Sequence, residues 1–216
     1  MPIVFPLVAT SFADLLLCQS FRWTLSRFVE SSGTALGQVI TNEIAAPKWR
    51  AELELISLRH ADAAKLQALI EAIGVAGTFY LHNPAHPGPR LDLAGTVLGG
   101  ASVTIGTVGA TNKTLALVGL PAGYVLSVGD MLSFSFGSNP TRRALHRVVE
   151  AATANGSGAT GNFEVRPFLK AGVSDGLAVT LVKPSAKMMI EPGSFEPGTA
   201  GRVFTRGMAF TAIEVR

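Results

Sequence analysis

Two histidines and an aspartate between positions 82 and 92 have the residue types and the spacing that could bind a metal. His82 and His86 stand four residues apart, the spacing that places two zinc ligands on one face of a helix, and Asp92 could add a carboxylate. Pro84 lies between the histidines and is incompatible with a helix there. We therefore interpret the segment as a polar linker and predict neither a metal nor a cofactor.

Ser57, His60 and Asp62 supply the three residue types of a catalytic triad. They stand too close together in the sequence, because the members of a triad converge from separate elements of a fold. Asp62 is better explained by the start of a helix, where a carboxylate interacts favourably with the helix dipole. No other nucleophile–base pair and no paired carboxylates stand out, so a hydrolase is the weakest hypothesis. We predict that the protein is not an enzyme.

The stretch from Gly106 to Thr114 is glycine-rich, like a phosphate-binding loop. Asn112 stands where such a loop needs its second glycine, and no helical pattern follows, so a β-turn is the better interpretation. The net charge of +3 comes from scattered cations, whereas a nucleic-acid surface needs a concentrated patch. The densest basic run is short and is expected to be a solvated loop: Arg142, Arg143, His146 and Arg147.

Aromatic residues in the second half of the chain raise the hypothesis of a sugar-binding barrel, in which exposed rings stack on a glycan. Phe134 and Phe136 lie two residues apart on one face of a predicted strand, which is typical of a core. We expect a core role and keep carbohydrate binding as the alternative function. The aromatic residues concerned are Tyr124, Phe134, Phe136, Phe163 and Phe168.

A strand, a helix and a second strand form the unit around which the chain is organised. Apolar and polar residues alternate from Trp49 to Leu55, as in a strand with one wet face. Residues 61–73 place their apolar side chains at helical spacing, and Gly74 follows where a helix ends. Residues 75–81 are predicted to form the second strand.

Trp49 is expected to be buried where this strand meets this helix. An indole on the apolar face of the strand would pack against Leu66 or Leu69 of the helix. Truncating a buried tryptophan to alanine costs about 3–5 kcal/mol.

A β-hairpin is expected before this unit. Residues 19–28 alternate as a strand, residues 31–34 have turn chemistry, and residues 37–44 alternate again. Residues 1–18 are predicted to form an extended arm with an apolar anchor at positions 15–17. The chain would thus begin with three antiparallel strands, counting the one at Trp49.

The overall composition favours a β-rich chain. Its 23 glycines and 12 prolines indicate many turns, and the 15% of charged residues is low for a free monomer. A subunit covered by copies or partners and a large β core explain that low charge equally well. Cys18 is the single cysteine, which excludes an internal disulfide and indicates folding in a reducing cytoplasm. No signal peptide and no apolar run of the ~20 residues of a membrane span is found.

A proline-rich segment, residues 83–90, separates two regions that differ in sequence pattern. After it come about six short apolar runs broken by glycine, with a strong turn signal at residues 155–158, which predicts a small barrel or sandwich. Strand-like alternation returns near Met208. We therefore predict one domain from residues 1–92 and 185–216, with its helix at 61–73, and a barrel inserted as residues 93–184.

Several segments are similar to tail-tip proteins of long-tailed bacteriophages, over most of the chain after residue 19. They are Trp-Arg-Ala-Glu-Leu from Trp49, Ala-Asp-Ala-Ala-Lys-Leu-Gln-Ala-Leu-Ile from Ala61, Gly-Thr-Phe-Tyr-Leu from Gly77, Val-Gly-Asp-Met-Leu-Ser-Phe from Val128, Leu-His-Arg-Val-Val from Leu145, Phe-Glu-Val-Arg-Pro from Phe163 and Val-Lys-Pro-Ser-Ala-Lys-Met-Met from Val182. The resemblance is to the distal tail, or baseplate hub, family, and its motifs are structural.

This resemblance implies a mainly β (α+β) fold: a tail-tube-like β-sandwich with one packed helix, plus an inserted small β-barrel. It implies a structural virion protein made in the host cytoplasm, whose copies form a ring of six at the tail tip. Its partners would be the tail tube protein, the hub protein and fibre proteins. It would contact DNA only while the DNA passes through the channel. It would not contact a membrane. The family has no catalytic residues to carry over.

The hairpin is the expected site of ring assembly. An isolated two-stranded hairpin is only marginally stable, so residues 19–44 need partners beyond themselves. Its edges offer unpaired backbone groups, and a closed ring is the solution for a head-to-tail interface. Sparse charges of both signs are compatible with pairing between identical neighbours. The hypothetical interface residues are Arg22, Trp23, Arg27, Glu30, Val39 and Glu43.

Overall fold

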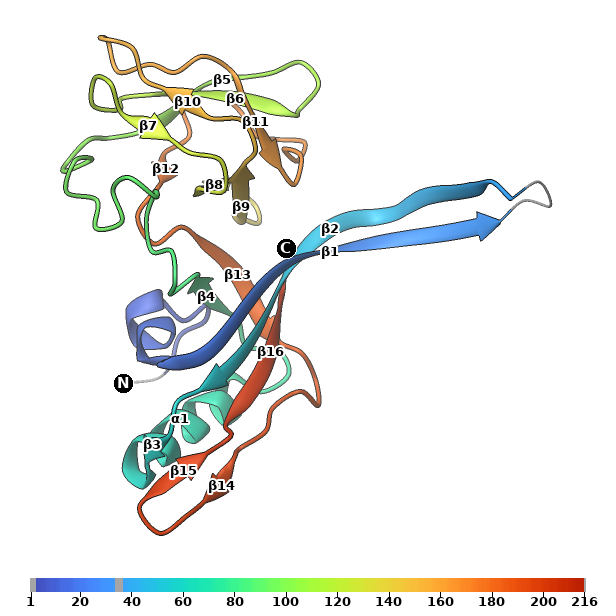
Figure 1. The fold of residues 1–216 in the computed structure, drawn as a ribbon, viewed down its shortest axis with the longest axis vertical. Coiled ribbons are helices and arrows are strands. Elements are labelled where there is room, and N and C mark those ends of the chain that lie inside the picture. Colours follow the sequence, from blue (N-terminus) through green and yellow to red (C-terminus); the bar gives the residue numbers. More distant parts are fainter. Residues whose placement is uncertain (1–2, 34–36, 216) are drawn as a thin grey trace.

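The computed structural model describes residues 3–33 and 37–215 and shows a mainly β protein, as predicted. Figure 1 shows a β-sheet with one helix in the lower part of the molecule and a barrel-like sheet above it. A long two-stranded ribbon leaves the body sideways at the level where the two parts meet.

The lower part is built on a five-stranded antiparallel sheet with the order β1-β2-β16-β13-β4. Two strands from the C-terminal part of the chain therefore lie between strands from its N-terminal part. Its strands are β1 (Cys18–Gly33), β2 (Val39–Leu55), β4 (Phe79–His82), β13 (Ser185–Ile190) and β16 (Ala209–Glu214).

The helix predicted at residues 61–73 is confirmed as α1, His60–Ile73. Its apolar stripe, which includes Leu66 and Ile70, is buried in the same core as the apolar face of the sheet. Gly74 ends the helix at a positive φ of 54°, which glycine adopts without steric cost. A small sheet lies beside the helix, with the order β14-β15-β3: β3 is Leu58–Arg59, β14 is Thr199–Ala200 and β15 is Phe204–Arg206.

The predicted hairpin exists, but its second strand is longer than expected. Residues 37–44 and the strand at Trp49 were predicted as separate strands, and the structure joins them in β2. Pro47 causes no break because it lies at a register shift, between Lys48 opposite Ser26 and Ala45 opposite Phe28. A strand tolerates a proline at such a bulge, where the ladder needs no N–H from it.

The strand predicted at residues 75–81 is shorter, because the chain first turns: Gly77 N donates to Ile73 O at 2.8 Å, and β4 begins only at Phe79.

The upper part confirms the small barrel. Its six-stranded sheet has the order β12-β8-β9-β11-β6-β5, and a bridge between Thr104 and Ala178 brings the two end strands together, so the sheet is nearly closed. A separate pair, β7 with β10, lies beside it. The strands are β5 (Thr104–Val108), β6 (Thr114–Val118), β7 (Val125–Leu126), β8 (Met131–Phe136), β9 (Arg142–Val148), β10 (Ala152–Thr153), β11 (Phe163–Arg166) and β12 (Val179–Thr180).

Two turns predicted in the barrel are confirmed, one in the glycine-rich stretch from Gly106 to Thr114 and one at residues 155–158. Asn112 N donates to Gly109 O at 2.9 Å, which makes the glycine-rich stretch a β-turn between β5 and β6. Asn155 accepts hydrogen bonds on its side-chain oxygen from the backbone N–H groups of Ser157 and Ala159, which closes the turn predicted there.

The basic run predicted as a solvated loop is instead the strand β9. His146 is completely buried, and Arg143 and Arg147 are half-buried. The Arg143 guanidinium donates to Ser133 Oγ at 2.8 Å and to the Ser185 carbonyl at 3.3 Å, so it joins the barrel to β13. The prediction failed because sheet neighbours cover a strand that is polar in sequence.

The N-terminal segment also differs from its prediction. It forms two short 3-10 helices, Ala9–Ser11 and Ala13–Leu15, rather than an extended arm. Of the anchor expected at residues 15–17, Leu16 is buried, together with Phe12, while Leu15 and Leu17 are exposed. Earlier in the segment, Leu7 pairs with β4: its N–H donates to Thr78 O at 2.8 Å, and its carbonyl accepts from Tyr80 N at 2.9 Å. One edge of the large sheet is thereby covered.

Candidate functional site

The most exposed feature of the described chain is the outer part of the β1–β2 hairpin, residues 27–33 and 39–46, here called the arm. Every described residue of the arm is exposed, and Figure 1 shows the two-stranded ribbon extending away from the body. A free two-stranded ribbon is only marginally stable in water. Its large apolar residues are open to solvent: Phe28, Val29, Val39, Ile40 and Ile44.

The hypothetical interface residues fall into two groups. Arg27, Glu30, Val39 and Glu43 lie on the arm, as expected, and are exposed. Arg22 and Trp23 lie nearer the body: Arg22 Nη1 is 3.7 Å from Glu52 Oε2. The indole of Trp23 is buried in its own chain, stacked on Phe21 with 5.6 Å between ring centroids, and is therefore not part of the exposed surface.

The outer edge of β1 is the second open feature. Among the described residues β1 pairs with β2 alone, whereas the opposite edge of the sheet, β4, is paired with Leu7. A free edge presents a row of unpaired N–H and C=O groups to solvent. The edge of this 16-residue strand can therefore accept a further strand from another chain.

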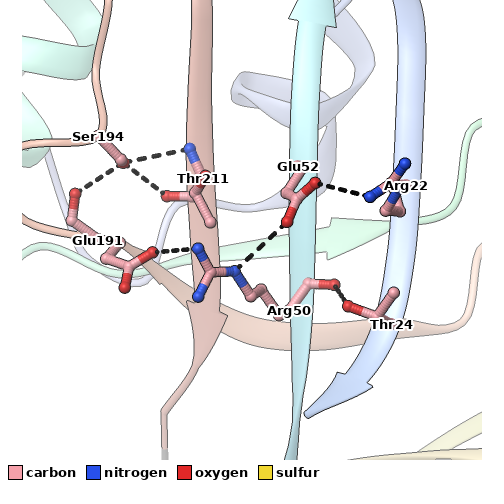
Figure 2. A network of polar contacts seen from close by, with 7 residues as sticks. All are labelled: Arg22, Thr24, Arg50, Glu52, Glu191, Ser194 and Thr211. Atoms are coloured by element: carbon pink, nitrogen blue, oxygen red, sulfur yellow. Dashed lines mark hydrogen bonds and ion pairs between the residues drawn. The ribbon is translucent and has the colours of Figure 1, made fainter.

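The wet face of the sheet carries a network of polar contacts, drawn in Figure 2. Arg50 bridges two carboxylates, with its Nε 3.7 Å from Glu52 Oε1 and its Nη2 3.0 Å from Glu191 Oε2. Ser194 accepts a hydrogen bond from Thr211 N at 3.1 Å, which fixes the loop after β13 on β16. Exposed ion pairs of this kind contribute at most about 1 kcal/mol each, so the network keeps the face polar rather than holding the fold together.

A cleft of about 550 Å³ opens where the arm leaves the body, and we call it the basal cleft. One wall comes from the hairpin, and it consists of Leu25, Arg27, Glu43, Ala46 and Pro47. The barrel supplies the other wall, with Arg142 and the residues 166–171. Its volume is in the range of pockets that bind small molecules.

Positive charge dominates the rim of the basal cleft. Two of its cations have carboxylate partners outside the lining: Arg166 pairs with Glu164, and Lys170 Nζ lies 3.1 Å from Glu214 Oε1. Arg27 and Arg142 form no ion pair with any described residue, and Glu43 is the acidic residue of the lining. The basal cleft thus combines apolar walls with a basic rim.

Phe168 lies in the basal cleft and corrects one prediction. Of the five barrel aromatics expected in the core, the other four are buried, but Phe168 is 43% exposed. The Arg166 guanidinium lies 4.3 Å from its ring centroid and the Lys113 ammonium 5.3 Å, both at distances typical of cation–π contacts. The ring therefore belongs to the basic surface.

Trp49 is buried, as predicted, and its indole contacts the barrel. Its Nε1 donates to the Leu145 carbonyl of β9 at 2.7 Å, and the Arg147 guanidinium lies 5.0 Å from its ring. Burial lowers the pKa of Arg147. Trp49 and Leu66 belong to the same hydrophobic core, against which Leu69 packs, and the contact of the indole with the barrel was not predicted. The indole ties the sheet to the barrel at the root of the arm.

Glu214 completes the same junction and was not singled out from the sequence. Its carboxylate accepts a hydrogen bond from Trp49 N at 3.1 Å and pairs with Lys170, while the residue is only 3% exposed. A signal for it exists: Phe210, Ala212 and Glu214 alternate on the apolar face of β16. A carboxylate in a core register needs a buried partner.

The residues considered for metal binding are separated by the fold. His82 is buried beside Asp14, with Nε2 3.7 Å from Oδ1, and burial lowers its pKa. His86 is exposed on the linker, and Asp92 accepts hydrogen bonds from Val97 N and Leu98 N. Among the described residues no group of three or more potential ligands is assembled.

The residues considered for a triad are not assembled either. His60 Nδ1 lies 3.0 Å from Thr205 Oγ1 rather than from Ser57, and Asp62 lies in the first turn of α1.

His146 gives the barrel a pH-dependent stability. Its ring stacks on Phe134 at 5.2 Å, Nδ1 donates to the Pro167 carbonyl at 2.8 Å, and Nε2 has no hydrogen-bond partner among the described residues. Burial lowers its pKa from 6.5 to about 4. The unfolded chain therefore binds an extra proton between these pH values, and the stability from His146, complete above pH 6.5, is lost as the pH falls towards 4.

We expect the free energy of unfolding to drop by about 2–3 kcal/mol more in the wild type than in His146→Gln between pH 7.5 and pH 4.5. Urea denaturation at the two pH values measures this difference. Equal pH slopes for the two proteins would contradict it.

None of the helices in residues 3–33 and 37–215 has the length and apolar character needed to cross a bilayer. In comparisons with known proteins, neither the family models nor the curated sequences match this chain.

Proposed function

We propose that this protein is a structural virion protein of a bacteriophage tail tip, whose copies form a ring that joins the tail tube to the baseplate hub or fibres. The proposal combines the resemblance of its sequence segments to the tail-tip family with one structural observation. That observation is the exposed arm together with the free edge of β1. In this proposal the arm makes the contact between neighbouring copies.

The arm and the free edge support assembly because each needs a partner that one copy does not supply. The arm exposes large apolar residues on a ribbon that nothing else supports, and exposed apolar surface favours association. The free edge of β1 offers backbone donors and acceptors for a strand of a neighbour. Since donor and acceptor surfaces differ, the contact is head-to-tail, and a ring is its closed form.

The same arrangement suggests which surfaces face which partners. The polar face of the sheet, with Arg22, Arg50 and Glu52, suits a hydrated channel through which DNA passes without being bound. The barrel lies on the other side of the arm and would meet the tube, hub or fibre proteins. The ring of six is carried over from the resemblance.

A carbohydrate-binding barrel is the second candidate, and the exposed ring of Phe168 is the observation that favours it. The ring is already in contact with Arg166 and Lys113, which makes it a poorer stacking plate for a sugar. A glycan array separates the two functions, since the structural role requires no glycan binding.

The ring is tested on the purified full chain. We expect light scattering and negative-stain images to show closed rings, with six copies in each. Deleting residues 31–37, some of which lie outside the described residues, should abolish rings and leave the barrel folded. Glu71→Gln, on the exposed side of α1, should assemble like the wild type. A wild-type chain that remains monomeric at high concentration would rule out this function.

A further inference from the structure

We propose that the arm of one copy inserts into the basal cleft of a second copy, between that copy's hairpin and its barrel. The inference rests on the proposed ring and names the surface that receives the arm. It would make the barrel part of the ring contact rather than an appendage outside it.

Charge complementarity is the first argument. The arm carries the carboxylates Glu30 and Glu43, and its one cation, Arg27, lies at its base, where Arg27 and Glu43 belong to the lining of the basal cleft. The rim of the basal cleft carries Arg27, Arg142 and Arg166, of which the first two have no ion-pair partner among the described residues. An acidic ribbon entering this cleft would supply carboxylates to unpaired guanidinium groups, which favours encounter and fixes the register.

The distribution of apolar residues on the arm is the second argument. Residues opposite one another in an antiparallel ladder share a face, so Val29 lies with Glu43, and Ile40 lies with Ser32 on the other face. Each face therefore carries both an exposed apolar residue and polar neighbours. A ribbon lying flat on a surface covers one face, whereas a ribbon between two walls covers both. The basal cleft has two walls, with Pro47 on the hairpin side and Phe168 on the barrel side.

Geometry excludes the chain's own arm as the occupant. The ladder of β1 and β2 continues to Gly33 opposite Val39, which keeps the arm extended. Eight residues of strand, from Ser26 to Gly33, span about 25 Å. Figure 1 shows this length running away from the barrel, so the tip of the arm cannot enter the cleft at its own base. A second copy has the same ribbon and can approach from outside.

Charge reversal with rescue tests the proposal in the full chain. Glu30→Arg alone and Arg142→Glu alone should each weaken association about tenfold, measured by light scattering over a dilution series. The double variant should recover association close to that of the wild type. Both positions are exposed, so neither change should unfold the chain, and circular dichroism checks this. Additive losses in the double variant would overturn the contact.

A cross-link places the arm directly. In a Cys18→Ser background, one chain carries Ser31→Cys and another carries Ala171→Cys, so only a disulfide between copies can join arm to cleft. We expect the mixed dimer on oxidation, and much less of it when Glu71→Cys replaces Ala171→Cys. Rings that assemble without the 31–171 cross-link would overturn this docking site but leave the ring function standing. A monomeric wild type would overturn both.

Discussion

Trp49→Ala is expected to lower the free energy of unfolding by about 3–5 kcal/mol, measured by urea denaturation. The indole is 1% exposed, so its removal leaves a cavity between the sheet and the barrel. It also leaves the Leu145 carbonyl without its donor, in a position where little water replaces it. The loss should appear in the barrel as well as the sheet, since the side chain belongs to the contact between them.

Two further variants serve as comparisons, one at this position and one at an exposed aromatic residue. Trp49→Phe keeps most of the apolar volume and should cost less than the alanine variant. Phe168→Ala removes an aromatic ring of which 43% is exposed, and it should change stability by less than about 1 kcal/mol. If Trp49→Ala lowered the free energy of unfolding no more than Phe168→Ala does, the indole would not be the link between the large sheet and the barrel.

Lys170→Met is expected to destabilise the protein by about 3 kcal/mol, because it leaves the Glu214 carboxylate buried without its cation. The Glu214 side chain is 4% exposed and that of Lys170 is 21% exposed, so the carboxylate has less access to water than the ammonium. Methionine keeps the length and most of the apolar stem of lysine. The measured loss should therefore report the missing charge rather than a cavity.

The double variant Lys170→Met with Glu214→Gln gives the decisive comparison. Glutamine keeps an oxygen that can accept from Trp49 N and removes the charge that Lys170 compensates. We expect the double variant to be more stable than the sum of the two single losses predicts, with a coupling of about 1–3 kcal/mol. Additive losses would mean that the two side chains stabilise the fold independently.

Local patterns of the sequence predicted the local elements well. The helical spacing of residues 61–73 and the alternation around Trp49 depend on neighbours three, four or two positions away, and the structure contains α1 and β2 there. The barrel followed from short apolar runs separated by glycine. These features were accessible because each pattern repeats within one element.

What covers a face could not be predicted from the same patterns. Alternation places Trp49 on the apolar face of its strand, but it does not reveal that the indole also reaches β9. The basic run Arg142, Arg143, His146 and Arg147 was predicted to be a solvated loop, because the burial of β9 comes from strands distant in sequence. The basal cleft likewise combines residues about 120 positions apart, such as Leu25 and Arg142. Glu214 is the exception. The sequence alone shows an acidic residue at a position of β16 that belongs to its apolar face.

The order of strands in the large sheet has a consequence for the nascent chain on the ribosome. β16 lies between β2 and β13, yet β13 and β16 are synthesised after all the barrel strands. The barrel can therefore complete its own pairing early, while the second edge of β2 stays open until β16 arrives. During that interval the hairpin is exposed on both sides, a condition in which nascent chains associate wrongly. We expect production of this protein to gain from slower translation and from chaperones that shield extended segments.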